Sequence, residues 1–174
     1  RRIKAGDEIP EAVLNNPAFQ MKALLPISAA ALRNWKEFAR RWLTHRNPYT
    51  GMSWAEDPAL YVVSFTNENN LDFCWNTVPE IGELYRKAFP GWMAEKYPGE
   101  TAGRADPAVN RRFREFLYER QHRCILDQME FLKNELKLVA LCTDLNMQNR
   151  VPLALIRNDL DVVDNHKYHD HPSF

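Results

Sequence analysis

The sequence predicts an α/β fold in which about three parallel strands are joined by crossover helices. Three short apolar runs, at residues 60–66, 137–142 and 160–165, are typical of strands that are buried on both faces, as in a parallel sheet. Stretches with helical spacing of apolar residues separate these runs. Strands that alternate with helices favour a parallel sheet with right-handed crossovers.

The predicted elements follow the chain in order. Residues 1–26 are punctuated by proline and are expected to form a long surface connection. Ser28 is a candidate N-cap for a helix whose apolar positions repeat with helical spacing, which predicts one core-facing side. These positions are Leu32, Trp35, Phe38, Ala39, Trp42 and Leu43. After the strand at 60–66, residues 69–106 are rich in aromatic residues, proline and glycine, and we expect an enlarged loop with short helices over the carboxyl ends of the strands.

The second half repeats this alternation. Asp106 is a candidate N-cap, with Pro107 in the first turn, for a long helix that runs to about Leu136. The strand at 137–142 follows this helix directly. Residues 152–158 must then hold the crossover helix that leads to the last strand.

A carboxyl group stands where the first strand ends. Glu68 follows the apolar run by two residues and is flanked by Asn67 and Asn69. Apolar neighbours such as Phe65 and Leu71 would desolvate the carboxyl and raise its pKa, so that it could hold a proton near neutral pH. Glu68 is therefore a candidate general acid, although a loop carboxylate in solvent would show the same pattern.

Four stretches, residues 45–51, 56–60, 66–69 and 164–168, occur in the order of a known family pattern. Together they resemble the retaining glycoside hydrolases of clan A, which are cellulase-like (β/α)8 barrels. In that family an Asn-Glu pair ends strand four and a His-x-Tyr motif ends strand six. The commoner family pattern has proline where this chain has Asn69.

The resemblance implies a role for several residues and implies no cofactor. Glu68 would be the acid/base, and Asn67 would bind the 2-hydroxyl of the sugar. His166 would line the sugar site, and Tyr168 would orient the nucleophile. Asn146, which follows the second strand, is a further candidate to bind a sugar hydroxyl, but turn residues of this type usually serve only the backbone.

The length predicts part of a barrel. A (β/α)8 barrel takes about 250 residues, and this chain has 174, with the likeness running from about residue 7 to 174. We therefore expect residues 1–174 to be a fragment of a single glycoside hydrolase barrel domain, a partial TIM barrel with about strands four to six. The nucleophile, a Glu at the end of strand seven, would lie outside this chain. The fragment alone is expected to be inactive, with open sheet edges that need the remainder of the barrel or self-association for stability.

Composition bears on partners other than carbohydrate. The chain has 23 basic and 23 acidic residues, which gives no electrostatic basis for binding nucleic acid or an anionic membrane. No apolar run approaches the roughly 18 residues of a transmembrane helix. Several arginines of residues 111–120 alternate with Glu115 and Glu119, which is typical of a solvated helix face. The three cysteines lack metal-ligand spacing and are expected to be buried free thiols.

Two other classes of function stay open at this point. A barrel with a non-acidic residue at the strand-seven position would bind carbohydrate without cleaving it. Alternatively, a C-terminal cluster supplies the ligand types that zinc prefers and would suit a metal-dependent hydrolase. The cluster consists of Asp164, His166, His169, Asp170 and His171. Strand alternation separates His169 and His171 from Asp164 and His166, so the pattern favours no metal site.

Overall fold

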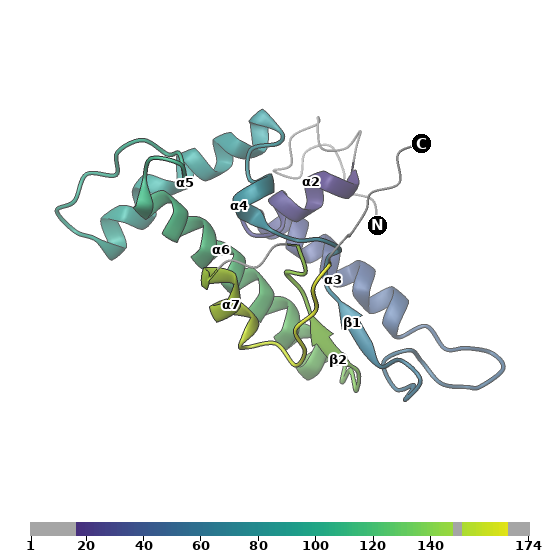
Figure 1. Ribbon diagram of the computed structural model, residues 1–174. Coiled ribbons are helices and arrows are strands. Elements are labelled where there is room, and N and C mark those ends of the chain that lie inside the picture. Colours follow the sequence, from purple (N-terminus) through teal and green to yellow (C-terminus); the bar gives the residue numbers. More distant parts are fainter. Residues whose placement is uncertain (1–16, 148–150, 167–174) are drawn as a thin grey trace, which may run out of the picture.

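The computed structural model describes residues 17–147 and 151–166 and is rich in helix, with one small parallel sheet (Figure 1). The elements, in chain order, are α2 (Pro17–Leu24), α3 (Ala29–Leu43), β1 (Val62–Ser64), α4 (Leu71–Cys74), α5 (Pro79–Lys96), α6 (Arg111–Glu130), the π-helix η1 (Phe131–Glu135), β2 (Leu141–Thr143) and α7 (Val151–Arg157). The chain is therefore an α/β protein, as predicted.

The sheet consists of β1 and β2, which are parallel neighbours. Val62 pairs with Leu141 and Ser64 pairs with Thr143. Two of the three predicted strands are confirmed, although each is only three residues long. The expectation that both faces are buried is wrong for β1, where Val62 and Val63 are half-buried and Ser64 is exposed. The predicted crossover helix after the second strand is also present, as α7. Two strands are too few to establish a barrel.

The prediction of a third strand at residues 160–165 is wrong. This segment runs alongside β2 in the same direction, because the Val162 N–H donates to the Cys142 carbonyl (3.3 Å) and the His166 N–H donates to the Asn146 carbonyl (2.8 Å). In a continuous parallel ladder, however, the Cys142 N–H would donate to a backbone carbonyl of this segment. Here it donates to Oδ2 of Asp161 (2.9 Å), and this side-chain bond interrupts the ladder.

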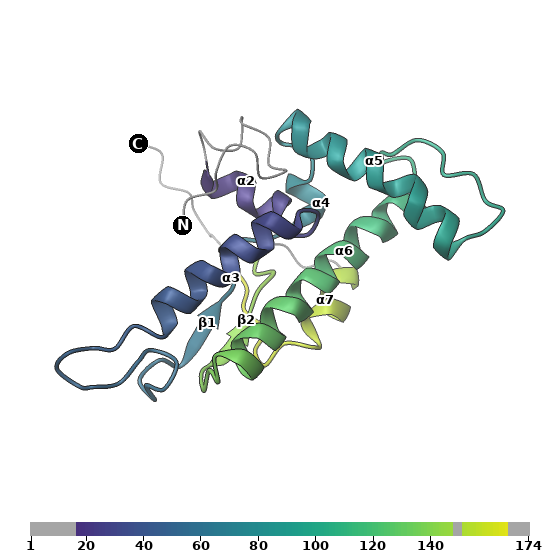
Figure 2. The same cartoon turned by 180° about the vertical axis from the view of Figure 1, so that it is seen from behind.

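The core has two parts. One packs α2, α4, α5 and part of α6 around a group of aromatic rings. The other lies between the sheet, α3, the end of α6, η1 and α7. Figure 1 shows β1 and β2 in front of α3 and α6, and Figure 2, seen from behind, shows the two helices in front of the strands. Both helices therefore cover the same face of the sheet.

Helix α3 begins where the sequence predicts, because Oγ of Ser28 accepts the N–H of Ala31 (3.2 Å). Its apolar positions are not all in the core. Phe38 is 66% exposed and Trp42 is 51% exposed, so the prediction is wrong for these two residues. Each lies one position before a buried residue of the stripe, about 100° around the helix, and so outside the contact with the sheet. The indole of Trp42 instead stacks on Trp54, with ring centroids 5.9 Å apart.

The predicted loop at 69–106 contains a long helix as well as a short one. Pro79 starts the 18-residue α5, in which buried Ile81, Tyr85, Phe89 and Trp92 recur at helical spacing. This stripe packs into the aromatic part of the core. Because the apolar period continues for about three turns, α5 is longer and more regular than the short helices expected from the proline and glycine content of this segment.

Helix α6 begins at Arg111 rather than at Asp106. The side chain of Asn110 accepts the N–H groups of Arg112 (2.9 Å) and Phe113 (3.3 Å), and this residue is the N-cap. Asp106 caps a separate turn instead, with its Oδ1 accepting the Ala108 N–H (2.9 Å). The helix then ends in a π-helical turn, in which the Leu136 N–H donates to the Phe131 carbonyl.

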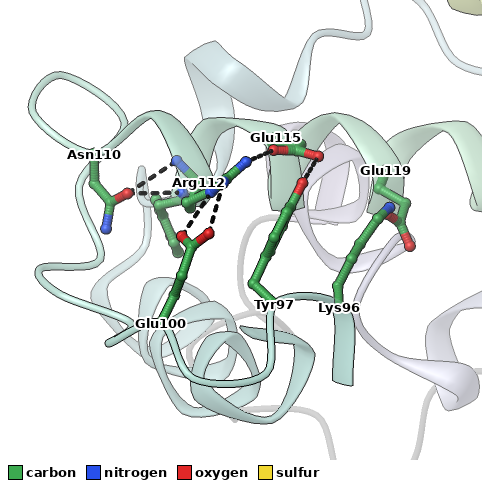
Figure 3. A network of polar contacts seen from close by, with 8 residues as sticks. Lys96, Tyr97, Glu100, Asn110, Arg112, Glu115 and Glu119 are labelled. Atoms are coloured by element: carbon green, nitrogen blue, oxygen red, sulfur yellow. Dashed lines mark hydrogen bonds and ion pairs between the residues drawn. The ribbon is translucent and has the colours of Figure 1, made fainter. Parts of the chain in front are cut away.

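A network of charged groups joins the end of α5 to α6 (Figure 3). The Arg112 guanidinium binds both carboxylate oxygens of Glu100 (2.9 and 3.1 Å) and reaches Glu115 (3.3 Å). Glu115 also accepts from the Tyr97 hydroxyl, and Glu119 pairs with Lys96. The predicted pairing of arginine with glutamate on this helix is confirmed for Arg112.

All three cysteines are free and buried, as predicted: Cys74, Cys124 and Cys142. Burial raises the pKa of the Cys74 thiol to about 12 and that of the Cys142 thiol to about 11. Thiols of this kind are poor nucleophiles at neutral pH. Among the helices of residues 17–147 and 151–157, none has both the length and the apolar character to cross a membrane.

Candidate active site

The turn after β1 holds Glu68 in an uncommon backbone conformation. Its φ is 50°, in the left-handed region that non-glycine residues seldom adopt. Two long-range contacts support this turn. The Glu68 N–H donates to Oδ1 of Asn146 (2.8 Å), and its carbonyl accepts from Nζ of Lys22 (3.3 Å) on α2. Strain of this type persists only where neighbouring structure holds it, and it is frequent at functional sites.

The turn after β2 lies beside the first turn and has the same feature. Leu145 is also left-handed, with φ 60°. The next residue, Asn146, is buried and uses both ends of its amide: Oδ1 accepts from Glu68, and Nδ2 donates to Oδ2 of Asp164 (3.0 Å). Its carbonyl accepts the N–H of His166. Asn146 therefore links the turn after β1 to the segment that runs along β2.

These contacts bring an imidazole between two carboxylates. Nδ1 of His166 lies 3.2 Å from Oε1 of Glu68, and Nε2 lies 3.6 Å from Oδ2 of Asp164. The first distance is that of a hydrogen bond, and the second would be that of an ion pair only with a protonated imidazole. The Glu68 side chain is 26% exposed, so solvent reaches it while most of its surface is covered. We call Glu68, Asn146, Asp164 and His166 the strand-end cluster.

A third carboxyl group, that of Asp144, stands two residues before Asn146 in the chain. Asp144 is fully buried, with Oδ1 accepting the Leu145 N–H (2.7 Å) and Oδ2 accepting Nδ2 of Asn69 (3.0 Å). Burial raises the pKa of Asp144 to about 7, although both hydrogen bonds and the charges of Lys22 and Arg157 act to lower it.

Asp144 was not among the residues that the sequence singled out as a site. One signal could have found it, because an acidic residue directly after a buried apolar strand is seldom there for packing. The polar residues after the second strand drew attention to Asn146 instead.

The structure brings together three of the five predicted site residues: Glu68, Asn146 and His166. Asn67 lies exposed in the turn beside Glu68, and Tyr168 lies outside the described residues. The apolar neighbours expected around Glu68 are buried, as Phe65 and Leu71 are both core residues. The amide of Asn146 is engaged with the protein at both ends, which favours the alternative that it supports the backbone. Its role toward a sugar stays a prediction.

These contacts do not test the alternative that the protein is a metal-dependent hydrolase. Within residues 17–147 and 151–166, no group of three or more His, Cys, Asp or Glu side chains is arranged to hold a metal ion. Three residues of the C-terminal cluster lie outside the described part of the chain: His169, Asp170 and His171. A metal-dependent hydrolase therefore stays a hypothesis.

Comparison of the chain with protein-family models, with curated proteins and with solved structures gave no match in any of the three. The resemblance to glycoside hydrolases therefore stays a hypothesis. The features that bear on function are the geometry of the strand-end cluster and the motifs that carry its residues.

Proposed function

We propose that this chain is part of a retaining β-glycosidase, a partial (β/α)8 barrel that acts on β-linked oligo- or polysaccharide with Glu68 as general acid and base. One observation carries the proposal: the partly exposed carboxyl of Glu68 follows the carboxyl end of a parallel strand, within 3.2 Å of the His166 imidazole. Barrel enzymes keep their chemistry at this edge of the sheet. The reaction needs no cofactor.

In the first step Glu68 gives its proton to the glycosidic oxygen as the bond from that oxygen to the anomeric carbon breaks. A second carboxylate bonds to the anomeric carbon from the opposite face, and retaining enzymes hold the two carboxyls about 5–5.5 Å apart. On the proposal this nucleophile is a Glu at the end of strand seven, outside this chain. Asn67 binds the 2-hydroxyl of the sugar, and Tyr168 orients the nucleophile.

In the second step water releases the sugar. Glu68, now a carboxylate, takes a proton from the water as its oxygen attacks the anomeric carbon, and the bond to the nucleophile breaks. Both carboxyls return to their starting states. The hydrogen bond between His166 and Glu68 keeps the Glu68 carboxyl in one orientation through both steps, and Asp164 on the far side of the imidazole steadies the ring.

The test is Glu68→Gln in the enzyme that contains these residues. Glutamine keeps the shape but has no transferable proton, so turnover of natural substrates should fall by about 10²–10⁴-fold. The loss should be smaller for aryl glycosides with good leaving groups, because their departure needs less protonation. Azide should restore turnover on these substrates and yield the β-glycosyl azide, since it needs no general base.

Glu80→Gln is the matched control, because Glu80 is an exposed carboxylate of α5. It should leave the rate unchanged. Wild-type activity on natural substrates in Glu68→Gln, or a product of inverted configuration from the native enzyme, would contradict the proposal.

A further inference from the structure

The residues beside the strand-end cluster converge on one buried carboxyl group. Asp144 accepts a hydrogen bond from Asn69, which follows Glu68, and another from the N–H of Leu145, which precedes Asn146. We propose that Asp144 is a positioning residue that holds these two neighbours and so fixes the Glu68 carboxyl against His166. The kinetic consequence rests on the proposed function, whereas the structural consequence does not.

The two turns need such support. Glu68 and Leu145 both adopt the left-handed backbone conformation, each at the end of a strand of the same parallel pair. In each turn the N–H of the left-handed residue is bound by a side chain from the end of β2: Asn146 binds that of Glu68, and Asp144 binds that of Leu145. Non-glycine residues keep this conformation only where such contacts over-determine it.

A basic residue also connects Asp144 to the turn that holds Glu68. Lys22, on α2, donates to the carbonyl of Glu68 and also acts electrostatically on Asp144. Arg157, on α7, also acts electrostatically on Asp144. A fully buried carboxyl is costly for folding, and an apolar residue of similar volume is often no worse for stability. This argues that the carboxyl serves the position of Glu68 rather than the stability of the core.

Two substitutions distinguish a role of Asp144 in positioning its neighbours from a role in packing. Asp144→Asn keeps the bond from the Leu145 N–H to its amide oxygen, and its amide NH₂ can donate to Oδ1 of Asn69 once that side-chain amide turns over. Oδ1 of Asn69 is buried and has no hydrogen-bond partner within the described residues, so it is available for this contact. Asp144→Leu has a similar size but loses both bonds.

The control is Thr143→Val. Thr143 is buried at the end of β2, next to Asp144, and its hydroxyl has no hydrogen-bond partner in the part of the chain that the structure describes, so valine keeps its size and removes no bond to the two turns. A change that comes only from repacking the end of β2 would therefore appear in both Asp144→Leu and Thr143→Val. A loss of positioning would appear in Asp144→Leu alone.

The experiment measures two quantities on each variant of the enzyme that contains these residues. The first is the ¹⁵N chemical shifts of the His166 imidazole, which respond to its hydrogen bond with Glu68. The second is kcat and KM on a β-linked oligosaccharide. Asp144→Leu should shift the His166 signals and lower kcat by about 100-fold with little change in KM, as expected for a displacement of about 1 Å. Asp144→Asn should recover the native signals and most of kcat.

A folded Asp144→Leu protein with native His166 signals would overturn the inference, whatever its activity. So would an equal shift of these signals in Thr143→Val. If the wild-type enzyme shows no glycosidase activity, the proposed function fails, and the His166 signals alone decide the inference. If Asp144→Leu does not fold, Asn69→Ala removes the same hydrogen bond from its other partner, and unchanged His166 signals in that variant would refute the role of Asp144.

Discussion

Replacing Asp144 with asparagine should change how the stability of the fold depends on pH. The side chain is fully buried, and burial raises its pKa from 3.8 to about 7. Between these two values the folded chain binds a proton that the unfolded chain has released. The stability that this group contributes is therefore complete below about pH 4, is lost as the pH rises from about 4 to 7, and stays constant above that range.

The magnitude follows from the same two values. The rise from 3.8 to about 7 spans roughly three pH units, which at 1.36 kcal/mol for each unit amounts to on the order of 4 kcal/mol. Asparagine does not ionise, so the variant does not lose stability in this way as the pH rises. The free energy of unfolding of Asp144→Asn, relative to that of wild type, should therefore increase by up to about 4 kcal/mol as the pH rises from 4 to 8. Urea unfolding followed by tryptophan fluorescence at several pH values measures this difference.

Asp161→Asn is the control, because its pH dependence has the opposite sign. Burial acts to raise the pKa of Asp161, but the hydrogen bonds from Lys133 and the Cys142 N–H, with the Lys133 charge, outweigh it and lower the pKa. The stability from Asp161 is present above its unfolded pKa and is lost as the pH falls. If the difference between Asp144→Asn and wild type stays constant from pH 4 to 8, the reasoning about a buried charge is refuted.

Two further predictions concern the fold and use the same unfolding assay. Phe113→Ala should lower the free energy of unfolding by about 3–5 kcal/mol, because the ring is fully buried and lies 4.9 Å from that of Trp75. Phe38→Ala, at an exposed position, should stay within about 0.5 kcal/mol of wild type, and equal losses in the two variants would contradict this assignment of the core. Asn110→Ala should cost about 1–2 kcal/mol as the loss of an N-cap, and a larger loss in Asp106→Ala would show that α6 starts at the earlier residue instead.

The sequence by itself predicted the elements whose signals are local. A side-chain cap fixes the start of α3 at Ser28, and apolar runs located β1 and β2, because each signal depends on residues close together in the chain. It also placed Glu68, Asn146 and His166 after strand-like runs. Parallel strands carry their ends to one edge, so three residues up to 98 positions apart were expected to meet there, and the structure places them in contact.

Tertiary contacts decided what local signals could not. The segment at 160–165 has a strand-like composition, but the Cys142 N–H of β2 donates to the side chain of Asp161, and this bond interrupts the ladder. The exposure of Phe38 and Trp42 depends on how much of α3 the sheet covers, which the helical period does not state. The role of Asp144 is of the same kind. Its burial and its two hydrogen bonds arise only when the turns after β1 and β2 lie side by side, because a buried polar group is defined by partners that are distant in the chain.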